Sequence, residues 1–102
     1  MDSESRKEIV DVSLLIVNEQ IGLVEGCRKL VSLRNQFALA EDQDFFPFVG
    51  VTSETDDYPE QSVRENFSDS YLKRVDKDVS CYVSIVRPSI IEACTVLVAK
   101  YK

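Results

Sequence analysis

Ten apolar residues in the last third of the chain recur mostly three or four positions apart, and this spacing constrains the fold more than any other feature. They are Leu72, Val75, Val79, Tyr82, Val83, Val86, Ile90, Ala93, Leu97 and Tyr101. A helix of 3.6 residues per turn places such positions on one face, so the spacing predicts a long amphipathic helical region. Pro88 removes one backbone hydrogen bond and clashes with the preceding turn. We therefore expect either two helices, over 69–87 and 88–100, or one helix kinked at Pro88.

The amino-terminal segment predicts a helix over residues 4–18. Ser5 and Glu8 have the spacing of a capping box. Four polar side chains return at helical spacing on one narrow face and leave the remaining circumference apolar; they are Glu4, Glu8, Asp11 and Asn18. Residues 9–17 also have the composition of a buried strand, an alternative that the period near 3.6 disfavours.

Residues 21–37 predict a second helix, in which an apolar set lies opposite a polar stripe. Gly22 and Gly26 stand four positions apart on one face of it, although each glycine costs about 0.5–1 kcal/mol of helix stability relative to alanine. Two interpretations remain open. Another helix backbone approaches closely at this face, or Gly22 marks a bend between two helices.

The stretch 41–62, EDQDFFPFVGVTSETDDYPEQS, carries the charge imbalance of the chain, because it holds seven acids and no base. The residue before Pro47 avoids the α region, so we expect a long loop here. Phe46, Phe48 and Val51 are expected to anchor this loop on the helical core, since large apolar side chains are rarely left together in solvent.

The polar segment that follows, residues 52–57, is expected to be exposed, and Pro59 begins a short predicted helix over 59–67. The predicted fold is all-α, with residues 1–102 forming a single domain. We expect an antiparallel bundle of four main helices plus a short one, with a long acidic crossover loop.

Charge and hydropathy limit the kinds of partner and compartment. The net charge is −6, and an acidic surface repels nucleic acid and anionic lipid, so we expect no direct nucleic-acid or membrane binding. The first residues lack a signal-peptide pattern, and the longest apolar run, 14–17, is too short to span a bilayer. These features favour a soluble cytoplasmic protein with reduced cysteines. Cys27 and Cys94 are expected in the core, and Cys81 partly exposed.

The sequence offers little for catalysis or for metal binding. It contains no histidine, which removes the commonest general base and the Ser-His and Cys-His nucleophilic pairs. The acidic pairs Asp42/Asp44 and Asp56/Asp57 lie in a hydrophilic run instead of an enclosed pocket that would separate their pKa values. We therefore expect a protein that is not an enzyme and that has no cofactor and no metal ion.

Acids beside aromatic residues form the candidate partner-binding site. Carboxylates pair with basic side chains and steer encounter, and aromatic side chains supply the buried anchor. The candidate residues are Asp42, Asp44, Phe45, Glu54, Asp56, Asp57, Tyr58 and Glu60. The alternative is that this run of charge is a solvated face that keeps the protein soluble.

Residues 21–30 (IGLVEGCRKL), 48–56 (FVGVTSETD) and 91–94 (IEAC) resemble a pattern in small uncharacterised bacterial proteins. The helical, acidic format of roughly a hundred residues is also similar to that of immunity proteins of bacterial contact-dependent growth inhibition systems. Such proteins bind and block a toxin domain, often a nuclease, that a sibling cell delivers. This resemblance implies a monomer in a cytoplasmic one-to-one inhibitor complex and no catalytic residues.

Two hypotheses for function follow. The first is an immunity-type inhibitor that binds a cognate toxin domain, a basic nuclease, and occludes its active cleft through the acidic stretch. The alternative is a small helical protein-interaction or adaptor domain, dimeric in form, that uses an exposed apolar helix face such as that of residues 72–86.

Overall fold

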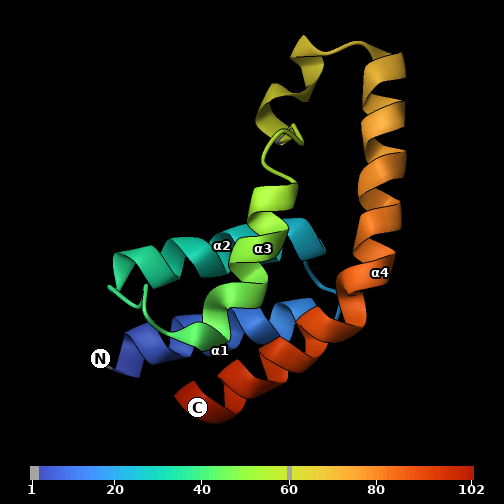
Figure 1. The fold of residues 1–102 in the computed structure, drawn as a ribbon. Helices are drawn as coiled ribbons and strands as arrows, with labels where there is room; N and C mark the ends of the chain where they lie inside the picture. Colours follow the sequence, from blue (N-terminus) through green and yellow to red (C-terminus); the bar gives the residue numbers. More distant parts are fainter. Residues whose placement is uncertain (1–2, 60) are drawn as a thin grey trace.

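The computed structural model describes residues 3–59 and 61–102, and in this part of the chain the only regular elements are helices (Figure 1). The elements are α1 (Ser3–Val17), α2 (Leu23–Gln36), the 3-10 helix η1 (Gln43–Phe45), α3 (Phe46–Glu54), the 3-10 helix η2 (Gln61–Asn66) and α4 (Asp69–Tyr101). The all-α prediction is confirmed. The strand considered for residues 9–17 is wrong, because this segment lies within α1.

The hydrophobic core lies between α1 and the carboxy-terminal half of α4, where α2 and α3 close it. The long helix α4 packs mainly on α1, whereas α2 packs on both α1 and α3. The core residues are Ile9, Ile16, Leu23, Val24, Cys27, Leu30, Phe45, Phe48, Val51, Ile90, Ala93, Cys94, Leu97 and Tyr101. The predicted burial of Cys27 and Cys94 and the exposure of Cys81 are confirmed.

The two glycines have different roles. A Cβ atom added at Gly26 would lie 2.4 Å from Cγ1 of Ile16, so this glycine makes room for an α1 side chain, and the nearest atoms are not the backbone atoms of another helix that were expected. Gly22 is the extended residue that precedes α2, with φ −60° and ψ 142°, and it marks the bend between the two helices.

The expectation of a long loop over 41–62 is wrong, because residues 43–54 are helical. Pro47 lies in the first turn of α3, where its missing N–H would have no intrahelical partner in any case. Phe45, Phe48 and Val51 recur three positions apart and are all buried, so their burial favours the helix. Phe46 points elsewhere and is 52% exposed, which corrects the expectation that it anchors the segment.

The long helix α4 is continuous from Asp69 to Tyr101 with Pro88 inside it, so the predicted split into two helices is wrong. Figure 1 shows α4 bending about halfway along, as the alternative of one kinked helix expected. Its amino-terminal half extends beyond α1 and α2 and has η2 beside it, and α3 crosses α2 at a steep angle. The packing therefore departs from a regular antiparallel bundle.

By length and composition alone, α4 could also cross a membrane. The longest uninterrupted apolar run, 14–17, gives no sign of this property. The core helix of a globular domain meets the same criterion, and the carboxy-terminal half of α4 supplies five buried residues to the core. The absence of a membrane partner therefore stays a prediction.

Candidate functional site

The acids of the stretch 41–62 do not form one surface. Asp42 and Asp44 both pair with the ammonium group of Lys100 near the end of α4, at 2.9 and 3.0 Å. Asp42 also accepts hydrogen bonds from the Tyr101 hydroxyl and from the backbone N–H of Asp44. These two carboxylates therefore fasten η1 to α4, and we no longer assign them to a partner surface.

The titration properties of this cluster fit a structural role. Burial acts to raise the pKa of Asp42, but the hydrogen bonds from Tyr101, Lys100 and the Asp44 backbone together outweigh it and lower that pKa. Burial, followed by the hydrogen bond to Asp42, raises the pKa of Tyr101 to about 12. On the other side, Arg6 of α1 donates from Nε to the carbonyl oxygen of Tyr101 at 3.2 Å.

Phe45 is fully buried, which corrects its assignment as a partner-binding residue. Its ring packs edge-on against those of Phe48 and Tyr101, with centroids 6.4 and 6.1 Å apart. The three-residue spacing of Phe45, Phe48 and Val51 is the sequence signal that could have placed Phe45 in the core.

Three of the predicted acids remain available to a partner. Glu54, Asp56 and Asp57 are exposed at the end of α3, and no ion pair to any of them occurs among the described residues. Thr55 between them is buried and donates from its hydroxyl to the carbonyl oxygen of Val51 at 2.7 Å, so the expected exposure of 52–57 fails at this residue. Glu60 lies outside the described residues.

Tyr58 is half-buried and belongs to a polar network that sequence analysis missed. Its hydroxyl donates to Asp76 of α4 at 3.0 Å and accepts from Arg64 of η2 at 3.3 Å. Arg64 completes the triangle with an ion pair to Asp76 at 2.7 Å. From the other side, Arg28 of α2 donates to the backbone carbonyl oxygens of Thr55 and Tyr58. These partners lie on different elements of the chain, so no local sequence pattern predicts their hydrogen bonds.

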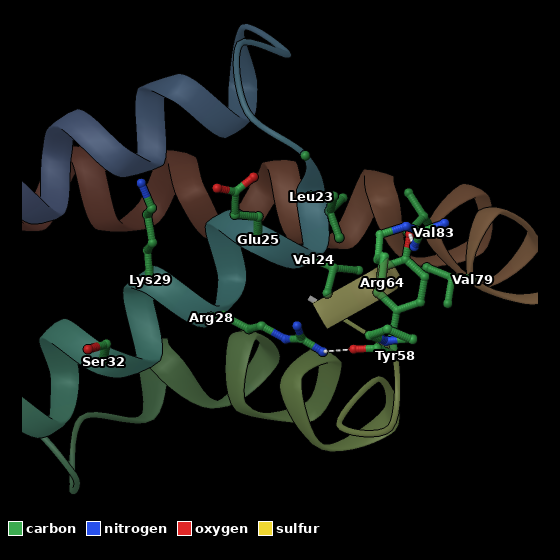
Figure 2. A pocket seen from close by; sticks show the side chains of 12 residues that line it. Leu23, Val24, Glu25, Arg28, Lys29, Ser32, Tyr58, Arg64, Val79 and Val83 are labelled. Atoms are coloured by element: carbon green, nitrogen blue, oxygen red, sulfur yellow. Dashed lines mark hydrogen bonds between the residues drawn. The ribbon is translucent and has the colours of Figure 1, made fainter. Parts of the chain in front are cut away.

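A cleft of about 790 Å³ opens between α2, the residues Tyr58, Pro59 and Arg64, and α4. Figure 2 shows Tyr58, Arg64, Val79 and Val83 gathered at one end and Lys29 and Ser32 at the other. The lining residues are Gly22, Leu23, Val24, Glu25, Arg28, Lys29, Ser32, Tyr58, Pro59, Arg64, Val79 and Val83. Apolar walls with a few charged groups at their edges are typical of binding sites.

Another face of α4, beside the one that lines the cleft, carries large side chains that the fold leaves partly exposed. Tyr71, Val75, Tyr82 and Ile85 recur three, four or seven positions apart, and Ile85 is 78% exposed. Burial and the nearby carboxylate of Glu54 raise the pKa of Tyr82, so the acidic end of α3 lies within electrostatic reach of this flank. We call these four residues the α4 flank.

No group of three or more Cys, Asp or Glu side chains suited to a metal ion occurs in the described ranges 3–59 and 61–102. Comparisons with protein-family models, curated proteins and solved structures found no match to this chain.

Proposed function

We propose that the protein is a binding protein that docks a second, basic protein along the α4 flank, in the manner of an immunity-type inhibitor. One observation carries the proposal. None of the side chains of residues 69–89 is buried, although the same helix holds five core residues from Ile90 onward. Ile85 is 78% exposed, and Tyr71, Val75 and Tyr82 on the same face are only partly covered. A cluster of incompletely covered apolar side chains is typical of interaction sites.

The composition of the flank supports a protein partner. Tyrosine is enriched among the residues that dominate the affinity of interfaces, because it buries a large area and keeps a polar group at its tip. Tyr71 and Tyr82 are both partly buried, and Tyr82 also packs against the core, whereas Ile85, between them and the bend of α4, is an uncovered aliphatic side chain. Burial of this set against a partner would supply the apolar part of the binding free energy.

The charge beside the flank favours a basic partner. Glu54, Asp56 and Asp57 present three free carboxylates at the carboxy-terminal end of α3, where the helix dipole is also negative. Such a cluster steers a positively charged surface into encounter and adds specificity. A toxin nuclease domain has a basic substrate cleft, so the proposed complex is a one-to-one inhibitor complex in the cytoplasm that occludes this cleft.

Reversal of the three carboxylates tests the electrostatic part of the proposal. The protein, immobilised, is used to capture partners from lysate and secreted toxins of the source cell, at low and then at moderate salt. With a captured partner in hand, we expect the triple variant Glu54→Lys, Asp56→Lys, Asp57→Lys to slow association more than it speeds dissociation. The matched control reverses Glu4, Glu8 and Asp11, which are exposed on α1. Equal association rates for the two triple variants would contradict a role of the α3 acids.

Self-association is the second candidate function, and the exposure of Ile85 favours it. A second copy of the chain carries the same apolar flank, and a two-fold interface can bury one flank against the other. Sedimentation at several protein concentrations separates the two candidates. A concentration-dependent dimer that Ile85→Arg abolishes supports the adaptor function, and a strict monomer rules it out.

A further inference from the structure

The cleft between α2 and α4 carries an inference that goes beyond the proposed function, because it lies on a different side of α4 from the flank. Val79 and Val83 line the cleft, whereas Tyr82 and Ile85 do not. Its volume of about 790 Å³ falls within the range of roughly 300–1,000 Å³ that holds small organic ligands.

The walls of the cleft are largely apolar and suit the apolar part of a ligand. Leu23 and Val24 from α2 face Val79 and Val83 from α4, and the ring of Tyr58 closes one end (Figure 2). A ligand that fills this space replaces water at Val79 and Val83, which are partly buried, and contacts the edges of Leu23 and Val24, which belong to the core. Aromatic or branched aliphatic groups match walls of this kind.

The charged groups at the edge of the cleft favour a negatively charged ligand. The guanidinium of Arg28 bonds to carbonyl oxygens, which leave its positive charge uncompensated. Lys29 is exposed and makes no ion pair among the described residues, whereas Arg64 is neutralised by Asp76. Glu25 is the single carboxylate in the lining of the cleft. The local balance is therefore positive in a chain whose net charge is −6.

We infer that this cleft binds a small organic carboxylate with an apolar body. The carboxylate lies toward Arg28, at the end of the cleft that Tyr58 closes, and the body packs between Val24, Val79 and Val83. Charge-assisted hydrogen bonds to Arg28 supply the selectivity for an acid over its neutral analogue.

A matched pair of probes tests the inference. Naphthalene-2-carboxylate and its uncharged carboxamide are titrated into the full-length, isotope-labelled protein at low salt, and backbone amide shifts are followed by NMR. We expect shifts at Val24, Val79 and Val83 and an affinity for the acid about tenfold higher than for the amide, as a hydrogen bond to a charged group provides. Equal affinities, shifts confined to other parts of the protein, or no shifts at millimolar probe would each overturn the inference.

Removal of the charge at the edge of the cleft supplies the second arm. Arg28→Gln should remove most of the preference for the acid, because the variant loses the positive charge that lies beside the probe. Lys77→Gln is the control, since Lys77 is an exposed residue of α4 outside the cleft lining and the variant changes the net charge by the same amount. Circular dichroism will check that both variants fold. An identical loss of affinity in the two variants would show only a general charge effect and would overturn the assignment of the anion to this cleft.

Discussion

Nη2 of Arg64 lies 2.7 Å from Oδ2 of Asp76, and this ion pair joins η2 to the amino-terminal half of α4. Tyr58 links the same two residues through its hydroxyl and connects them through its backbone to Arg28 of α2. The hydrogen bond to Arg64 lowers the pKa of Asp76, so the carboxylate is ionised at neutral pH. One polar network therefore holds the part of α4 that has no buried residue.

Loss of this ion pair should loosen the amino-terminal half of α4 selectively. Asp76→Asn removes the charge but keeps the shape of the side chain, and the exposed position predicts little change in melting temperature. We expect faster backbone amide exchange over residues 69–86, with unchanged exchange in α1. Asp78→Asn is the control, because Asp78 is an exposed acid of the same helix turn without an ion pair among the described residues. Equal exchange in the two variants would contradict the role of Asp76.

Burial of Tyr101, together with its hydrogen bond to Asp42, should give the protein an alkaline stability transition. The pKa of Tyr101 is raised from 10 to about 12, so the folded state holds its proton where the unfolded state has lost it. The corresponding stability is fully present below pH 10 and is lost as the pH rises toward 12.

Urea unfolding at pH 8, 10 and 11 measures this loss as a decrease in the free energy of unfolding. Tyr101→Phe should show a smaller decline of the urea midpoint with pH than the wild type does. Tyr71→Phe serves as the control, since Tyr71 is a half-exposed tyrosine without a carboxylate partner among the hydrogen bonds described. If the urea midpoint of Tyr101→Phe declined with pH as steeply as that of the wild type, another group would control the transition.

The three cysteines should differ sharply in reactivity. Burial raises the pKa of the Cys27 thiol, with a further contribution from Cys94, and burial alone raises that of Cys94, each to about 12. The thiolate is the reactive form, and Cys81 alone is exposed. A thiol reagent at pH 8 should modify one cysteine of the folded protein rapidly and the other two only in denaturant. Cys81→Ser should abolish the rapid phase, and a rapid phase that survives would contradict the burial of the other two.

The two glycines Gly26 and Gly50 should respond oppositely to alanine. A Cβ at Gly26 would collide with Ile16, and overpacking of this kind costs about 1–3 kcal/mol. Gly50 lies within α3 with no atom within 4 Å of the added Cβ, so Gly50→Ala should stabilise the protein by about 0.5–1 kcal/mol. Equilibrium unfolding measures both values. A stabilising Gly26→Ala would contradict the close approach of α1 and α2.

Local periodicity was sufficient to predict α1, α2 and the helical character of residues 69–101, because each buries a face whose spacing is visible in the sequence. It fails at α3, because the restriction on the residue before Pro47 predicts a loop, whereas proline is well suited to the first turn of a helix and lies there in α3. The burial of Phe45 favoured the helix over the loop.

The candidate site was less predictable than the fold, because its contacts join residues distant in sequence. The number of acids in residues 41–62 suggests a single cluster that contains both Asp42 and Glu54. In the structure Asp42 instead forms an ion pair with Lys100, which lies 58 residues later in the chain. The contacts of Arg28 with the end of α3 likewise depend on the packing of α2 against α3. Only the helices, once packed, bring these groups together.

The central claim is that a partner docks on the α4 flank, and Ile85 offers its most direct test. Quantitative mass spectrometry compares the proteins captured from the source cell by the wild type, by Ile85→Arg and by Val96→Arg, in which an exposed aliphatic residue of the other half of α4 is changed. We predict a basic partner that the wild type and Val96→Arg capture equally and that Ile85→Arg loses, with all three proteins melting at the same temperature. Capture of the same partner by Ile85→Arg at the wild-type level would contradict the claim.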